Sequence, residues 1–137
     1  AAFSISPLLT IHLLIVVIAI MAILAAVLVP TVTSKIKDAN DSATASDLRA
    51  MLSNISYEVA EGKDPTTPTP TEDIKVVRGT AANANNFYFK VKFETADKAR
   101  SVTGNNSAAK GDHYLTYNIE TGAQTWSAAV PTGVSFS

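Results

Sequence analysis

Hydrophobic residues are spread very unevenly along this chain of 137 residues. Within residues 8–29 only Thr10 and His12 are polar. A helix rises about 1.5 Å per residue, so a run of this length spans the roughly 30 Å hydrocarbon core of a membrane. Ser6 and Pro7 are typical of a helix start, because serine caps the first turn and proline is tolerated at the first helical position. The pattern therefore predicts a membrane-length helix that begins at Pro7.

The helical pattern continues after this run, but with apolar residues on one side only. Pro30 lies inside the combined segment and has no amide hydrogen, so we expect it to kink or locally unwind one long helix. Gly62 follows the last apolar position and is expected to end the helix. The apolar stripe consists of Val32, Ile36, Ala39, Ala43, Leu48, Met51, Leu52, Ile55 and Val59, whereas Lys37, Asp41, Asp47 and Glu58 are assigned to the other side.

The second half of the chain has the pattern of a linker followed by strands. Residues 64–73 alternate threonine with proline, which predicts an extended surface linker. "NFYFKVKFE", residues 86–94, alternates strictly, with Phe87, Phe89, Val91 and Phe93 on a buried face and Tyr88, Lys90, Lys92 and Glu94 on a wet one. Further strands are predicted at residues 74–78, 113–120, 123–130 and 133–137, with a tight hairpin at Thr121-Gly122. We therefore predict an α+β fold, in which an antiparallel sheet of four to five strands packs on the long N-terminal helix.

The charged residues add a boundary to this picture. The chain has 11 Lys plus Arg and 12 Asp plus Glu, a net charge of −1, and none of these residues precedes Lys35. From there on the composition is that of a small soluble domain. Without cysteine there is no disulfide, and without a basic cluster we expect no nucleic-acid partner. The predicted parts are an apolar transmembrane or filament-core half-helix (1–30), an amphipathic half-helix (31–62), a Thr/Pro linker (63–73) and a β-sheet head domain (74–137).

Patterns that carry catalysis are missing from the sequence. It has no Gly-rich phosphate loop, no His-Glu-x-x-His and no Gly-x-Ser-x-Gly, and its two histidines are far apart. Asp112 and His113 form the one adjacent pair of acid and imidazole, which we interpret as a solvated turn. Trp126 is expected in the core or at a domain contact. We expect a protein that is not an enzyme, with no catalytic, cofactor-binding or metal-binding residues and no cofactor.

The apolar run can be interpreted as a cleaved signal, as a membrane anchor or as a surface on which another helix packs. A secretory signal has a basic start and an apolar run of about 7 to 15 residues, so we expect this longer, uncharged segment to be retained. Ala19, Ala22 and Ala25 recur every third residue and Ala26 lies four after Ala22, which predicts a side where another helix packs closely. The same spacing also arises by chance, because alanine is common in membrane helices. His12 fits either an interfacial position or a specific intersubunit contact.

The run "LLTIHLLIVVIAIMAILAAVLVP" resembles the N-terminal segment of type IV pilins. In that family a short start containing threonine leads into Leu-Leu-Ile-Val-Val, an alanine-rich core and then a proline. The match from Leu13 to Pro30 is nearly position by position. "NDSATASDLRAMLSNISYEV", residues 40–59, is similar to the Ser-Ala-x-x-Ser-Asp-Leu-Arg run in the outer half of the bacterial pilin helix. The strand-rich remainder matches only in general architecture.

The resemblance implies a structural subunit of a type IV pilus-like surface filament built from identical copies. It also implies that the helix is held in the cytoplasmic membrane before assembly, that a prepilin peptidase trims a short leader, and that the pilus assembly machinery builds the extracellular filament. A secretion-type pseudopilin is a near alternative, and a monomeric membrane-anchored adhesion or solute-binding module is the alternative from another class. The filament's role in adhesion, motility, DNA uptake or secretion stays open. The filament-core packing residues are expected to be Leu13, Leu14, Val17, Ala19, Ala22, Ala25 and Ala26.

Two departures from the bacterial pattern point towards archaeal pilins. Bacterial pilins place a glutamate at the fifth mature position, which the family resemblance implies pairs with the N-terminal amine of a neighbour. Alignment on Pro30 puts Leu13 at that position, next to His12. The residues "AAFSISP" precede Leu8, and Ser-Pro before the aliphatic run is more similar to archaeal pilins, which generally lack that glutamate. We therefore expect an archaeal or archaeal-like pilin, with the mature N-terminus undecided.

Three Asn-x-Ser sequons occur in the chain, at Asn40, Asn54 and Asn105. Asn40 and Asn54 are predicted on the long helix. Asn105 lies in the loop "TGNNSAAKGD" and is therefore the best candidate for N-glycosylation. Chance sequons are also expected in a chain this rich in Asn, Ser and Thr.

Overall fold

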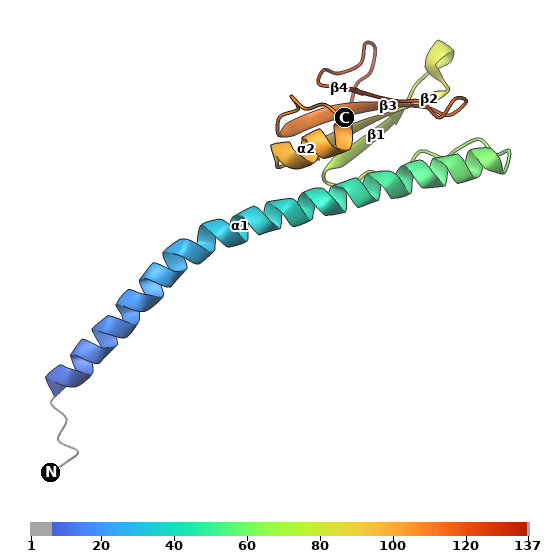
Figure 1. Cartoon of the computed structure of the whole chain (residues 1–137). Coiled ribbons are helices and arrows are strands. Elements are labelled where there is room, and N and C mark those ends of the chain that lie inside the picture. Colours follow the sequence, from blue (N-terminus) through green and yellow to red (C-terminus); the bar gives the residue numbers. More distant parts are fainter. Residues whose placement is uncertain (1–6, 137) are drawn as a thin grey trace. The chain divides into compact units, whose positions relative to one another are not determined.

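The structure, a computed structural model, describes residues 7–136 of the chain. It has the predicted α+β fold, with one long helix followed by an antiparallel sheet of four strands (Figure 1). The chain divides into two compact units, an N-terminal unit that ends at Ile36 and a C-terminal unit that begins at Lys37. The elements are α1 (Pro7–Ala60), β1 (Ile74–Arg78), the 3-10 helix η1 (Ala81–Asn83), β2 (Asn86–Phe93), α2 (Ala96–Thr103), β3 (Gly111–Asn118) and β4 (Gln124–Ser127).

Helix α1 begins at Pro7, as predicted, whereas the expected cap Ser6 lies outside the described residues. Every position from Pro7 to Ala60 is helical, so the local unwinding that we considered at Pro30 does not occur. Proline is compatible with a helix when the neighbouring turn satisfies its own polar groups. The kink at Pro30 stays a prediction.

Two threonine hydroxyls that follow Pro30 donate hydrogen bonds to carbonyl groups that precede it. Thr31 Oγ1 donates to the carbonyl of Val27 over 3.1 Å, and Thr33 Oγ1 donates to the carbonyl of Val29 over 2.9 Å. A hydroxyl that bonds back to its own helix exposes no free donor to an apolar environment. The polar residues that follow Pro30 therefore do not interrupt the helix.

The helix ends as Gly62 predicts. Gly62 has φ +77°, a left-handed conformation that glycine adopts without strain. Its N–H donates to the carbonyl of Val59, and the N–H of Lys63 donates to the carbonyl of Glu58, both over 3.0 Å. This pair of bonds is the Schellman arrangement, which satisfies the last carbonyls of a helix. The chain then leaves α1 in a fixed direction.

The sheet is a simple meander in which each strand pairs with the next along the chain. Its register aligns Val76 with Phe89, Phe89 with Leu115, and Leu115 with Trp126, so these side chains share one face. The alternation predicted for residues 86–94 is confirmed on this face. Phe87, Phe89, Val91 and Phe93 are all at most 1% exposed.

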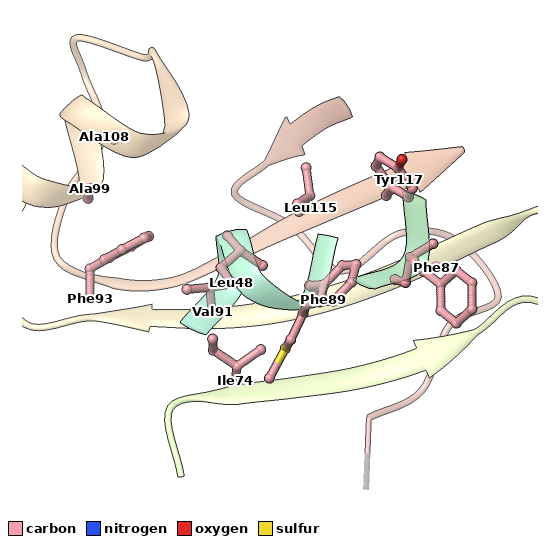
Figure 2. Packing of buried hydrophobic residues seen from close by; sticks show 12 residues of the cluster. Leu48, Ile74, Phe87, Phe89, Val91, Phe93, Ala99, Ala108, Leu115 and Tyr117 are labelled. Carbon is pink, nitrogen blue, oxygen red and sulfur yellow. The ribbon is translucent and has the colours of Figure 1, made fainter. Parts of the chain in front are cut away.

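The core joins one side of α1 to this face of the sheet. Leu48, Met51 and Ile55, three and four residues apart, place their side chains on one side of the helix. They pack against Ile74 and against the buried residues of β2 and β3 (Figure 2). The amphipathic part of α1 and the sheet therefore form one compact unit, the C-terminal unit. The other buried residues of this hydrophobic core are Phe87, Phe89, Val91, Phe93, Ala99, Ala108, Leu115 and Tyr117.

Helix α2 was not predicted, although its sequence carries the usual end signals. Thr95 caps it by accepting a hydrogen bond from the N–H of Lys98 over 3.3 Å. Asp97 lies in the first turn, where a negative charge is favourable, and Gly104 ends the helix with φ +73°. Because this helix has only eight residues, its sequence pattern was not distinguished from the neighbouring strand patterns.

The last predicted strand, residues 133–137, is wrong over its described part, because residues 133–136 form no strand. The segment lies instead against the outer face of the sheet. The ring of Phe136 is 5.7 Å from the ring of Tyr114, and residues 132–135 lie beside Tyr88 around a hollow of about 120 Å³. This explains why Tyr88, which we predicted on the wet face, is only 6% exposed.

The first part of the predicted helix stripe is also wrong. Asp41, assigned to the polar side, is 1% exposed. Its carboxylate accepts hydrogen bonds from the N–H of Glu94 over 2.7 Å, from the N–H of Thr95 over 2.8 Å and from the Thr95 hydroxyl over 2.7 Å. A buried carboxylate is tolerated when donors surround it in this way. Asp41 thus joins α1 to the turn between β2 and α2, whereas Val32, Ile36, Ala39 and Ala43 are exposed.

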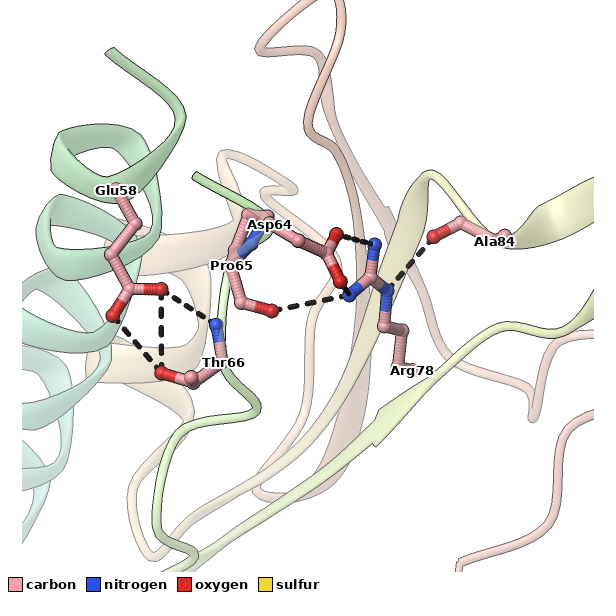
Figure 3. A network of polar contacts seen from close by, with 6 residues as sticks. All are labelled: Glu58, Asp64, Pro65, Thr66, Arg78 and Ala84. Atoms are coloured by element: carbon pink, nitrogen blue, oxygen red, sulfur yellow. Dashed lines mark hydrogen bonds and ion pairs between the residues drawn. The ribbon is translucent and has the colours of Figure 1, made fainter. Parts of the chain in front are cut away.

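The linker after α1 contains no helix or strand over residues 63–71, and it is held at its start (Figure 3). Arg78 Nη2 and Nη1 donate to the two carboxylate oxygens of Asp64 over 2.8 and 3.1 Å. Nη1 also donates to the carbonyl of Pro65, and Nε donates to that of Ala84. The guanidinium lies 5.2 Å from the ring centre of Phe87, which adds a cation–π contact. One arginine therefore ties the linker to β1.

A second tie joins the linker to α1. The N–H of Thr66 donates to Glu58 Oε2 over 2.6 Å, and its hydroxyl donates to Oε1 over 3.0 Å. Both bonds are drawn in Figure 3. Pro65, which lies between the two ties, is buried. The start of the linker therefore belongs to the packed structure of the C-terminal unit.

We expect Asp41→Ala to destabilise the C-terminal unit by about 3 kcal/mol, because it leaves buried N–H donors without an acceptor. The free energy of unfolding is measured by urea denaturation of the full chain in detergent. Asp47→Ala is the matched control, since Asp47 lies on the same helix and is exposed. Equal stability of the two variants would contradict the assigned role of Asp41.

The tie between Arg78 and Asp64 predicts a dependence on pH. Hydrogen bonding from Arg78 holds the pKa of the Asp64 carboxyl below its ordinary value of 3.8. A folded-state pKa that is lowered gives stability that is present above the unfolded-state pKa and is lost as the pH falls through the folded-state pKa. We expect the stability difference between the wild type and Asp64→Asn to be constant at neutral pH, and to shrink below about pH 4. Urea denaturation across this range measures it, and a difference that grows on acidification would refute the tie.

Candidate functional site

The candidate functional site is the surface of the N-terminal unit. Every large apolar side chain between Leu8 and Ile36 is at least 50% exposed, and none of the described residues of this unit is buried. By contrast, six residues of α1 that belong to the C-terminal unit are buried. Between Leu8 and Val29 only Thr10 and His12 are polar, so this run is apolar around its whole circumference and no side of it resembles an ordinary wet surface. Such a surface needs a covering from outside the chain.

The predicted packing residues all lie on this surface. Leu13, Leu14 and Val17 are 58%, 57% and 52% exposed. At about 100° per residue, the four alanines fall within about 120° of the helix circumference. This side therefore has little side-chain volume, while the opposite side carries bulky residues. The small side consists of Ala19, Ala22, Ala25 and Ala26, all of which are exposed.

His12 is exposed and bonds to its own helix. Its Nδ1 lies 2.5 Å from the carbonyl oxygen of Leu8. A carbonyl oxygen only accepts, so Nδ1 must carry the proton in this arrangement. The other ring nitrogen, Nε2, is then the atom through which the ring would meet a lipid head group or a neighbouring subunit. Neither of the two predicted roles of His12 is tested by this contact.

Helix α1 is long and apolar enough to cross a membrane, and it is the one such helix among residues 7–136. The criterion rests on length and composition, and a signal sequence near the N-terminus also meets it. Thr10 and His12 are the polar residues within residues 8–29. The N-terminal unit is therefore suited to a membrane anchor.

The three sequons have different surroundings. Asn40 is exposed, but its Nδ2 donates to Glu94 Oε2 over 3.2 Å, close to the buried Asp41. Asn54 is exposed in the interior of α1. Asn105 is exposed in the loop after α2, as predicted. All three lie in the C-terminal unit.

The adjacent Asp112 and His113 do not act together. They are neighbours on β3, so their side chains lie on opposite faces of the sheet. Asp112 Oδ2 is 3.7 Å from the Nζ of Lys90, whereas His113 is 7% exposed and its Nε2 lies 2.7 Å from the carbonyl oxygen of Ala109. The solvated turn that we expected for this pair is wrong for His113, which is buried. The geometry offers no acid and imidazole dyad.

Acidic groups at the end of α1 line an open hollow beside the linker. Glu61 accepts a hydrogen bond from Lys63, and this bond, with a second from Tyr57, holds the pKa of the Glu61 carboxyl below its ordinary value. Glu58 accepts hydrogen bonds from the N–H and the hydroxyl of Thr66. A carboxyl group with a lowered pKa, such as that of Glu61, does not serve as a general acid near neutral pH. Within the described part of the chain, no three His, Asp or Glu side chains gather as a metal site.

Comparison of this chain with family models, with curated proteins and with solved structures found no match.

Sequence reasoning missed the polar residues that make the site's surroundings stable. Asp41 lies four and seven residues before Ala45 and Leu48, so the helical spacing of the buried side extends to it, but its charge hid this position. Thr31 and Thr33 follow Pro30 at positions where their hydroxyls reach back one turn. The helical spacing in the sequence was a signal both for the burial of Asp41 and for the bonds of Thr31 and Thr33.

Cysteine labelling tests whether the apolar surface is embedded in lipid, because the chain has no cysteine of its own. Ile18 and Tyr57 are both 64% exposed, one near the middle of the apolar run and one in the C-terminal unit. We expect Ile18→Cys to resist a water-soluble maleimide in intact membranes, since a thiol in hydrocarbon does not ionise. Tyr57→Cys is the matched control and is expected to react. Equal reaction of the two variants in intact membranes would show that the helix is not embedded.

Proposed function

We propose that this chain is the structural subunit, the pilin, of a type IV pilus-like extracellular filament. One observation carries the proposal: a helix that is exposed and apolar on every side continues without a break into a helix that is packed on its own sheet. The packed half needs no further partner, because its core is complete. The exposed half needs a partner surface along its whole length.

The size of the exposed surface explains why it must be covered. Burying a single large aliphatic side chain stabilises by about 1.5 to 3 kcal/mol, so covering the N-terminal unit is worth tens of kcal/mol. Lipid and copies of the same helix both supply such a cover. We propose that lipid covers the unit before assembly, and that copies cover it afterwards in the filament core.

The small side of the helix favours the second environment. Without a hydrophobic difference between lipid and helix, association of helices in a membrane depends on close packing, and small residues allow it. The four exposed alanines provide such a side. A monomeric anchor has no need of it. This supports a helical homo-oligomer over the membrane-anchored adhesion or solute-binding module.

The C-terminal unit is proposed to lie on the filament surface. Its core is internal, and its exposed positions are mainly polar or charged. The subunit is proposed to start in the cytoplasmic membrane, where a prepilin peptidase and the pilus assembly machinery act on it. Leu13 stands where bacterial pilins carry a glutamate, so recruitment of a neighbour through that charge is not part of the proposal. His12 is proposed to make an intersubunit contact through Nε2 instead.

A substitution on the small side of the helix tests the proposal. We expect Ala22→Phe to abolish filaments in sheared surface fractions while the chain still enters the membrane, because a bulky ring prevents close approach of helices. Ala22→Ser keeps the side small and is expected to assemble. Ile20→Phe places the ring on the opposite, bulky side and is also expected to assemble.

Electron microscopy of sheared material and immunoblotting of membranes give the two readouts. Filaments formed by Ala22→Phe at the wild-type level would contradict packing through the small side. Recovery of the wild-type chain only as a monomer from detergent-extracted membranes would contradict the filament and favour the anchor.

A further inference from the structure

Asn105 has the geometry of a modification site. Its Oδ1 accepts a hydrogen bond from the N–H of Ser107 over 2.9 Å, and its own N–H donates to the hydroxyl of Thr103 over 3.2 Å. These bonds fix the loop that follows Gly104. Because Oδ1 is engaged, the amide nitrogen Nδ2 is the part of the side chain left for chemistry, and it makes no hydrogen bond within residues 7–136. Ser107 supplies the hydroxyl of the sequon two residues after the asparagine.

The other two sequons lack this combination. The Nδ2 of Asn40 is already a donor to Glu94, and the next residue, Asp41, is buried in its own bonds. Asn54 lies inside α1, and the serine of its sequon, Ser56, is hydrogen-bonded to the hydroxyl of Tyr117 over 2.8 Å. A sequon inside a packed helix cannot adopt a different backbone without unfolding. Asn105 is therefore singled out by structure, and not by its loop position alone.

A hollow of about 290 Å³ lies directly beside Asn105 and includes it in its wall. The wall also contains the half-buried Trp126, the chain's one tryptophan, and the side chains of Thr103, Gln124 and Thr125. Neutral hydrogen-bonding groups around one aromatic ring suit a neutral polyhydroxylated ligand. His113 also borders the hollow, but its Nε2 is engaged by the carbonyl of Ala109. The hollow has no Lys, Arg, Asp or Glu in its wall.

We propose that Asn105 carries an N-linked glycan whose first sugar lies in this hollow against Trp126. Nδ2 forms a bond to the anomeric carbon of a saccharide donated from a lipid-phosphate carrier. The bond between that carbon and the phosphate oxygen breaks, the lipid phosphate leaves with the electron pair, and one amide proton passes to a base. The glycan covers the open side of Trp126 and places sugar beside the edge strand β4, which begins at Gln124. Sugar there blocks unwanted pairing of that edge with another chain.

This inference rests on the part of the proposed function that places the C-terminal unit outside the cytoplasm. Its test is mass spectrometry of peptides from the chain purified from its source organism, with membrane and sheared fractions analysed separately. We expect the peptide with Asn105 to carry the added mass of a glycan and the peptides with Asn40 and Asn54 to be unmodified. An unmodified Asn105 peptide in filaments overturns the inference but leaves the filament intact. A glycosylated chain that stays in the membrane and never forms filaments overturns the filament but supports the inference.

Two variants separate the glycan from the fold of the loop. Ser107→Ala removes the sequon hydroxyl but keeps the N–H that bonds to Asn105, so we expect a folded chain that has lost the glycan mass. Ser107→Thr keeps the sequon and is expected to retain the mass. Retention of the mass in Ser107→Ala would overturn attachment through this sequon.

Trp126 reports directly on the hollow, because it is the only tryptophan of the chain. We expect its fluorescence to shift to the red and to be quenched more strongly by acrylamide in Ser107→Ala than in the wild type, while Asn54→Gln leaves both unchanged. Equal quenching in a glycosylated wild type and in Ser107→Ala would overturn the docking of the sugar on Trp126. An unmodified chain whose Trp126 emission changes with free N-acetylglucosamine would also overturn the proposal, in favour of a hollow that binds sugar from outside.

Discussion

A helix that is apolar on all sides cannot remain in water, and this constraint governs the first half of α1. The N-terminal unit exposes large aliphatic residues along its whole length, and nothing else in the described chain covers them. Any function must therefore supply a cover of hydrocarbon or protein. A filament of identical subunits satisfies the constraint with no additional partner, because each copy provides the surface that the next one needs.

The second half of α1 obeys the opposite constraint, since it must be held by its own domain. Leu48, Met51 and Ile55 bury its apolar side, and Asp41 adds a polar contact to the turn before α2. Arg78 and Glu58 then hold the start of the linker. These bonds give the C-terminal unit a core and a polar framework of its own. One continuous helix thus joins a part with no buried residues to a part that is packed on its own sheet.

The sequence predicted the elements whose pattern is set by strong local forces. The apolar run, the stop at Gly62 and the alternation in β2 all follow from burial and backbone preferences. Contacts between distant segments could not be read in the same way. The burial of Asp41 depends on donors more than fifty residues away, and the burial of Tyr88 depends on the C-terminal segment. For the candidate site, the sequence predicts the apolar run and its exposed alanines, but it does not predict what covers them, because one sequence carries no information on a neighbouring molecule.

In the proposed filament, the N-terminal unit is covered by copies of itself. Electron cryomicroscopy of filaments sheared from the source organism, with helical reconstruction, would show this cover. We expect α1 helices bundled along the filament axis, with Ala22 at helix contacts and the sheet of the C-terminal unit on the outside. Filaments that lack this chain, or that contain it with residues 8–29 exposed to solvent, would rule out this arrangement.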